Sequence, residues 1–120
     1  MQYMLMFYED AGEFAKRNDA DTAPAYWGAW TAYIGALNQA GIVIAGNGLL
    51  PPDAATTVRI ENGQRLVQDG PVAATKEQLG GYFVIEVADL DAALAWAARS
   101  PSASAGATEV RPVLPAPPQG

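Results

Sequence analysis

The chain has 120 residues, half of them hydrophobic, with no cysteine, no histidine and a net charge of −6 at pH 7. This length suits one domain with a single hydrophobic core. The lack of cysteine excludes disulfides and thiolate chemistry, and the lack of histidine removes the usual general base and the commonest metal ligand. Any acid–base chemistry therefore depends on carboxylate, lysine, tyrosine or arginine side chains.

Charge and hydropathy argue against nucleic acid and membranes as partners. The seven basic residues are scattered, and a net negative charge repels a phosphate backbone. No apolar stretch approaches the roughly 20 residues of a membrane helix, and residues 1–8 lack the basic flank of a secretory signal. We expect a soluble, cytoplasmic protein with one domain at 1–114 and a Pro-rich tail at 115–120.

A strand and a long helix are the first predicted elements. Residues 3–8 carry large apolar side chains at odd and even positions, which indicates a strand covered on both faces. Asp21 or Thr22 caps the helix, Pro24 lies in its first turn, and Gly41 ends it. Its apolar stripe is expected to face a sheet and consists of Trp27, Trp30, Ile34 and Leu37, with Tyr26 and Tyr33 at its edge.

Short β segments are predicted in the middle of the chain, at residues 42–45, 56–60, 65–68 and 82–87. The Asn62-Gly63 pair is a strong hairpin signal, so the second and third segments should pair antiparallel. Asp69-Gly70-Pro71 then turns the chain, and a short helical turn is expected at 75–78. The segment 82–87 is apolar on most of both faces, which predicts a central strand.

A second helix and an edge strand complete the predicted domain. Asp89 caps the helix, which runs to about Arg99 and ends at Pro101. Its buried stripe is expected to be Leu90, Ala93, Leu94 and Ala97. A loop of small residues follows, and the strand 109–113 contains Pro112, which favours the edge of a sheet.

This order of elements predicts an α+β fold, a ferredoxin-like split βαβ arrangement with an inserted hairpin. Two helices can cover only one face of such a sheet. Because strands 3–8 and 82–87 are apolar on both faces, the second face needs a cover, and a second copy of the chain supplies one. The sequence therefore predicts a homodimer.

Several segments together resemble the YCII-related family, in its branch named for an Asp-Gly-Pro-Phe motif. The matching residues are Tyr3-Met4-Leu5, Gly46-Asn47-Gly48-Leu49, Pro51-Pro52, Ala55 to Arg59, Asp69-Gly70-Pro71, Thr75 to Tyr82, and Glu109 to Val113. The resemblance spans nearly the whole chain. It implies a ferredoxin-like subunit in a dimeric α/β barrel with a small cleft between sheet and loops.

The resemblance also implies lyase or isomerase chemistry on small molecules, with a His-Asp pair proposed as catalytic in the broader family. This chain departs from that pattern, because Val72 stands where the motif has Phe and no histidine is present. Members of the branch tend to be encoded near extracytoplasmic-function sigma factors, which implies an alternative, non-catalytic role as an accessory or regulatory protein.

Five residues are candidates for the site. Asp69 either holds its turn by accepting backbone hydrogen bonds or moves a proton as the catalytic group. Lys76 and Tyr82 are expected to orient an anionic or carbonyl substrate. Glu86 either faces a polar cavity or forms an ion pair with Arg111 on another strand, and the ion pair is favoured.

Neither the glycines nor the acidic residues point to a bound cofactor. The glycines at 46, 48, 80 and 81 form no phosphate-binding fingerprint, and the acidic residues are dispersed as helix caps and surface groups. The sequence therefore calls for no nucleotide, metal or other cofactor. It predicts a homodimer that binds a small anionic or carbonyl compound, with lyase or isomerase activity as one reading and a regulatory protein partner as the other.

Overall fold

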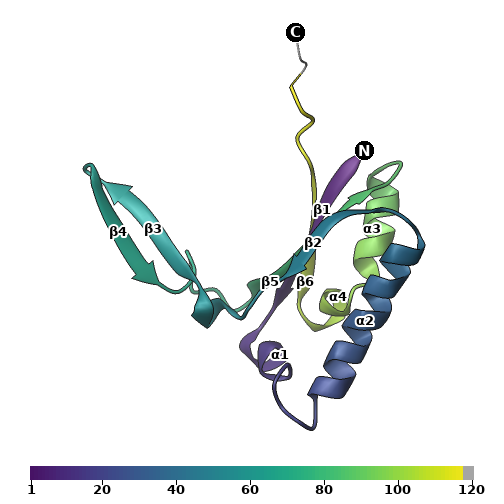
Figure 1. Ribbon diagram of the computed structural model, residues 1–120, viewed down its shortest axis with the longest axis horizontal. Helices are drawn as coiled ribbons and strands as arrows, with labels where there is room; N and C mark the ends of the chain where they lie inside the picture. Colours follow the sequence, from purple (N-terminus) through teal and green to yellow (C-terminus); the bar gives the residue numbers. More distant parts are fainter. Residues whose placement is uncertain (118–120) are drawn as a thin grey trace.

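The computed structural model describes residues 1–117, which form a four-stranded antiparallel sheet, helices on one of its faces and a separate hairpin (Figure 1). The sheet has the order β2-β5-β1-β6, with bounds Val43–Gly48, Gln78–Glu86, Gln2–Glu9 and Ala107–Pro112. This order, with helices connecting β1 to β2 and β5 to β6, is the predicted ferredoxin-like fold. The predicted central position of β5 and edge position of the strand that contains Pro112 are confirmed.

Strand β1 divides its side chains between the two faces of the sheet. Tyr3, Leu5 and Phe7 are buried and face the helices, whereas the even-numbered residues are only partly buried. Met4 lies opposite Val84 in the register with β5, so the second face is also apolar. Figure 1 shows the helices on one side of the sheet, which leaves this second face open in the single chain.

Helix α2, Ala23–Gln39, supplies most of the core opposite β1. Its buried residues are Tyr26, Trp30, Tyr33 and Leu37. The predicted burial of Trp30 and Leu37 is confirmed. The rest of the predicted stripe is wrong by a rotation about the helix axis, because Trp27 is 46% exposed and Ile34 is only partly buried. The spacing 26, 30, 33, 37 is as helical as the predicted one, and contact with Phe7 selects it.

Two short helices were not predicted. Helix α1, Ala11–Ala15, begins at Asp10, whose Oδ1 accepts a 2.9 Å hydrogen bond from the Glu13 amide. Helix α4, Pro101–Ala105, lies where a loop was expected. Proline at the first position of a helix costs no hydrogen bond, so Pro101 starts a new helix as well as ending the previous one.

Helix α3, Leu90–Ala98, begins at Asp89 as predicted, with a 2.9 Å hydrogen bond from the Ala92 amide to Asp89 Oδ1. Only Ala93 and Ala97 of its expected stripe are buried, and Leu90 and Leu94 are nearly half exposed. Within residues 1–117 no helix combines the length and the apolar character needed to cross a membrane.

The inserted hairpin forms a sheet of its own and projects away from the main body (Figure 1). It consists of β3, Thr56–Glu61, and β4, Gln64–Asp69, and follows a single 3₁₀ turn at Pro52–Ala54. Asn62 and Gly63 have φ of 50° and 74°, the conformation that the predicted two-residue turn requires.

The helical turn predicted at 75–78 is wrong. Gln78 begins β5 and pairs with Glu9 across the sheet. Its side-chain amide donates hydrogen bonds to the carbonyl oxygens of Ala73 and Thr75, at 2.7 and 3.0 Å. These bonds hold the segment before β5 as a loop.

Candidate small-molecule site

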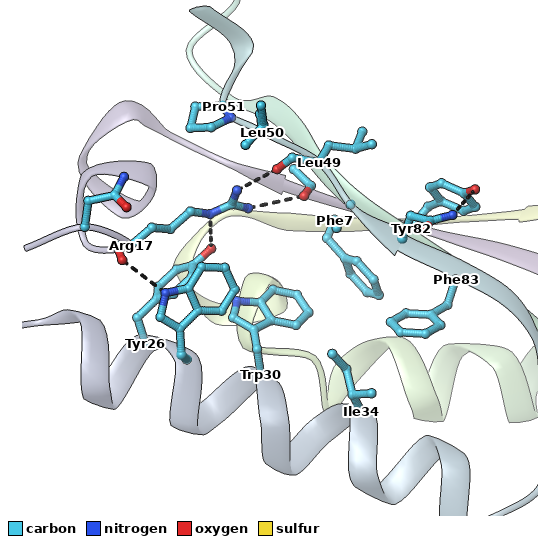
Figure 2. Close-up of a pocket in the computed structure, with 16 residues that line it drawn as sticks. Phe7, Arg17, Tyr26, Trp30, Ile34, Leu49, Leu50, Pro51, Tyr82 and Phe83 are labelled. Carbon is cyan, nitrogen blue, oxygen red and sulfur yellow. Dashed lines mark hydrogen bonds between the residues drawn. The ribbon is translucent and has the colours of Figure 1, made fainter. Parts of the chain in front are cut away.

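A partly enclosed cavity of about 400 Å³ lies between α2 and the neighbouring ends of β2 and β5 (Figure 2). Its aromatic and aliphatic lining consists of Phe7, Tyr26, Trp27, Trp30, Ile34 and Phe83, with Leu49, Leu50 and Pro51 along one side. A volume of several hundred Å³ with mostly apolar walls and few polar groups is typical of small-molecule sites.

The inner wall of the cavity is built from aromatic rings in edge-to-face contact. The ring of Phe7 lies 4.9 Å from Trp30 and 6.1 Å from Phe83, measured between centroids. Such contacts hold the rings in fixed orientations, so the wall is preformed for a planar apolar group. The indole nitrogen of Trp30 is buried and has no hydrogen-bond partner among the described residues.

Glycine at position 46 allows Phe83 to take its place in this wall. Gly46 and Phe83 are opposite each other in the pairing of β2 with β5. A Cβ atom at position 46 would overlap the Phe83 ring, whereas a Cβ atom at position 48 would meet nothing within 4 Å.

We therefore expect Gly46→Ala to lower the free energy of unfolding by about 1–3 kcal/mol, because the ring of Phe83 must move out of a packed position. Chemical denaturation measures this change. Gly48→Ala in the same strand is the matched control and should cost much less. Equal losses in the two variants would contradict the packing of Phe83 over Gly46.

Arg17 forms the polar end of the cavity and lies in the turn that follows α1. Its side chain is 10% exposed. Nη1 donates to the carbonyl of Leu49 at 2.6 Å, Nη2 to the carbonyl of Gly80 at 3.2 Å, and Nε to the hydroxyl of Tyr26 at 3.0 Å. The guanidinium carbon lies 5.4 Å from the centroid of Trp27. Arg17 thus places a fixed positive charge beside aromatic rings.

Glu9 and Tyr26 lie behind Arg17. Glu9 is 2% exposed, and its Oε1 accepts a 2.7 Å hydrogen bond from the Tyr26 hydroxyl and lies 3.6 Å from Arg17 Nη2. Burial raises the pKa of the Glu9 carboxyl, although Tyr26 and Arg17 act in the opposite direction. Burial, together with the hydrogen bond to Glu9, raises the pKa of Tyr26 to about 12. Tyr26 therefore stays protonated near neutral pH.

The five residues predicted from the sequence do not meet in this cavity. Asp69 is exposed at the end of β4 in the projecting hairpin. Lys76 lines a separate, more open cavity. Tyr82 borders the aromatic cavity, but its side chain points to the open face of the sheet, where its hydroxyl accepts a 3.0 Å hydrogen bond from Asn47 (Figure 2).

The predicted ion pair between Glu86 and Arg111 is wrong. Glu86 lies 2.6 Å from the amino group of Met1, and Arg111 lies 2.6 Å from Glu109. Each observed pair joins groups that are close together in the sheet. Gln2, next to Met1, pairs with Glu86 across β1 and β5, and Arg111 is two residues from Glu109 along β6. These pairs are exposed, and exposed pairs contribute little to stability.

One residue of the cavity region had a signal in the sequence. Glu9 continues the odd-numbered series of Tyr3, Leu5 and Phe7, so it places a carboxylate on the core side of β1. Buried carboxylates need a partner, which could have directed attention to a buried cation or hydroxyl. Arg17 lies in a turn outside any periodic pattern and gave no such signal.

Within residues 1–117, no group of acidic side chains is arranged to hold a metal ion. The polar side chains that line the cavity are Arg17, Asn18, Tyr26, Trp27, Trp30, Asn47 and Tyr82. The Arg17 guanidinium and the Trp30 indole nitrogen are donors that can bind ring oxygens or a delocalised anion, whereas the Tyr26 hydroxyl already donates its hydrogen to Glu9.

Comparisons with known proteins find similarity to a curated protein and to solved structures. The chain is 48% identical over 67 residues to an uncharacterised protein of Rhizobium meliloti strain 1021, and this stretch is 54% of each chain, about half the length of the relative. It is similar in fold to 5-chloro-2-hydroxyhydroquinone dehydrochlorinase of Burkholderia phenoliruptrix AC1100, solved with 2,5-dihydroxybenzoquinone. That match has a TM-score of 0.55 and 16% identity, and covers 95% of this chain and 94% of the other.

The match to a family model shows the family of this chain. The model of the YCII-related domain matches residues 1–117, which confirms the resemblance seen in the sequence. The chain belongs to the YCII-related domain family.

Proposed function

We propose that the aromatic cavity binds a small planar ring with hydroxyl or carbonyl oxygens, and that the protein is a lyase for such compounds. The observation that carries this proposal is the position of Arg17 beside the rings of Trp27 and Tyr26 in a cavity whose walls are mostly aromatic and aliphatic. Aromatic faces stabilise a ring by stacking or edge contact, and a fixed cation stabilises a ring oxygen that carries negative charge.

The structural neighbour supports this choice of substrate class. Its name and bound molecule describe a chlorinated hydroxyhydroquinone and a dihydroxybenzoquinone. Loss of HCl from a chlorinated trihydroxybenzene gives a hydroxyquinone without an external oxidant, because chloride leaves with its bonding electron pair. One hydroxyl proton moves to the ring carbon that loses chloride, and a second is released. We propose elimination of this kind for the present chain.

The donors of the cavity suit such a ring. Nη1 of Arg17 donates one hydrogen to Leu49 at an exposed position, and its second hydrogen has no partner among the described residues. Trp30 supplies a buried donor without a partner in that part of the chain. A ring oxygen near Arg17 and Trp30 would accept from both groups, and leaving a buried donor such as the Trp30 indole unsatisfied costs about 1–3 kcal/mol.

Equilibrium dialysis with 2,5-dihydroxybenzoquinone tests ligand binding in this cavity. Ile34 lines the cavity, so Ile34→Trp should fill part of the space and weaken binding at least ten-fold. Leu94→Trp on α3 adds the same side chain at an exposed position outside the cavity lining, so affinity should stay within about two-fold. Equal affinities of the two variants, or no binding by the unaltered protein, would overturn the proposal.

A further inference from the structure

We infer that Tyr26 and Glu9 form a proton relay that deprotonates a hydroxyl of the ring bound beside Arg17. This inference rests on the proposed function and names the residues that act as the general base in it. A chain without histidine needs another acceptor for the hydroxyl proton, and Glu9 is a buried carboxylate that the proposed binding of the ring does not use.

The first part of the relay is the geometry of the Tyr26 hydroxyl. It donates to Glu9 Oε1 at 2.7 Å and accepts from Arg17 Nε at 3.0 Å. The second lone pair of the hydroxyl oxygen takes part in no hydrogen bond within the described residues. Because Tyr26 lines the cavity, this lone pair can accept a proton from a bound ring.

The second part is a route from Glu9 to solvent. Glu9 lines another cavity of about 330 Å³, on the other side of Tyr26, together with Glu13, Lys16, Asp21 and Thr22. Tyr26 and Trp30 line both cavities and so form the wall between them. A proton that reaches Glu9 can leave through this more open cavity without entering the ligand site.

The step consists of two proton transfers. The ring O–H bond breaks and its proton forms a new O–H bond on Tyr26, while the original Tyr26 proton moves to Glu9 Oε1. Tyr26 is neutral before and after, Glu9 becomes a carboxylic acid, and the ring oxygen becomes an anion beside the Arg17 guanidinium. Tyr26 is the catalytic residue and Glu9 acts through it.

The charged groups around Glu9 set the pH dependence of this step. Arg17 and Tyr26 favour its ionised form, Glu13 disfavours it, and Lys16 lies at the same cavity. Burial has the largest effect and raises the pKa of Glu9 above its ordinary value of 4.5. Since only ionised Glu9 accepts a proton, turnover should rise with pH through this raised pKa.

A purely structural role for Glu9 makes the opposite prediction. If Glu9 only neutralised Arg17, its replacement by glutamine would leave the guanidinium more available to a ring anion, and turnover would stay equal or increase. The relay requires a large decrease.

Chloride release from 5-chloro-2-hydroxyhydroquinone, measured against pH, separates these roles. Tyr26→Phe and Glu9→Gln should each lower kcat by roughly 10²–10⁴ and abolish its rise with pH, while affinity for 2,5-dihydroxybenzoquinone changes by less than about five-fold. The double variant should be no slower than the slower single variant, because both groups serve one step.

Tyr33→Phe is the matched control. Tyr33 is a second buried tyrosine of α2 whose pKa is also raised to about 12, but its hydroxyl donates to the carbonyl of Trp96 outside the cavity lining. Its loss should leave kcat and the pH profile unchanged. Each of the two test variants is informative alone if the other does not fold.

The possible results distinguish the two proposals. If the unaltered protein releases chloride and Tyr26→Phe and Glu9→Gln do so at similar rates, the relay is overturned and the lyase function stands. A higher rate for Glu9→Gln than for the unaltered protein has the same meaning. Binding of 2,5-dihydroxybenzoquinone without chloride release overturns the lyase activity and the relay, and absence of binding overturns the proposed function as a whole.

Discussion

Replacement of Trp30 by alanine should lower the free energy of unfolding by about 3–5 kcal/mol, because it removes a large aromatic side chain from a packed core. Trp30 is 8% exposed, and its ring lies 4.9 Å from Phe7 and 6.0 Å from Tyr33 between centroids. The contact with Phe7 joins α2 to β1, so its loss weakens the packing of the main helix on the sheet. Chemical denaturation monitored by circular dichroism measures it.

Trp27→Ala is the matched control in the neighbouring position. Trp27 is 46% exposed, and its indole nitrogen donates one 3.0 Å hydrogen bond to the carbonyl of Arg17. We expect a loss of about 1–1.5 kcal/mol, the size of one hydrogen bond and partial burial. If Trp27→Ala were the more costly variant, Trp27 rather than Trp30 would lie on the buried side of α2, which would contradict the packing described here.

The protein should have twice its chain mass of 12.6 kDa in solution, because we propose that the open face of the sheet packs against a second copy. This face includes Met4, Met6, Tyr82 and Val84, and no helix of the described chain covers it (Figure 1). The radius of gyration is 16.5 Å, against about 14 Å for a compact chain of this length. An extended shape with an uncovered apolar face favours self-association.

Light scattering at micromolar concentration measures the mass. Val84→Glu should give a folded monomer, since it would bury an unpaired carboxylate in the interface. Leu94→Glu on α3 introduces the same charge at an exposed position on the helical side and should leave the dimer intact. A monomeric unaltered protein would contradict the proposal.

The parts of the fold that could be predicted are those with local chemical signals. Asp89 has a side chain that caps a helix, and Asn62-Gly63 can adopt the positive φ that a tight hairpin turn needs. Apolar residues at both parities of β1 correctly indicated a strand with two apolar faces. In the helix cap and the hairpin turn, the decisive interaction lies within a few residues of the signal.

The rotation of α2 could not be predicted in this way. The sequence contains aromatic residues at 26, 27, 30 and 33, so two overlapping stripes are equally periodic. Contact with Phe7 of β1 buries Trp30 and Tyr33 and leaves Trp27 at the edge. The choice depends on tertiary packing, which periodicity alone does not contain.

The candidate site was harder still to predict, because it combines residues that are distant in sequence. Arg17 contacts Leu49 and Gly80, which are 32 and 63 residues away along the chain. The sequence directed attention to Asp69 and Lys76, which lie outside the aromatic cavity. The catalytic role of Asp69 and the substrate-binding role of Lys76 stay predictions. The accessory role expected from the family would gain support if the cavity bound no ring.

The most direct test of the account is a crystal structure of the protein with 2,5-dihydroxybenzoquinone. We expect the ring to lie among Phe7, Trp30 and Phe83, with one oxygen within hydrogen-bond distance of Arg17 or Tyr26. A ring bound instead beside Asp69 and Lys76, or on the open face of the sheet, would contradict the central claim that the aromatic cavity is the functional site.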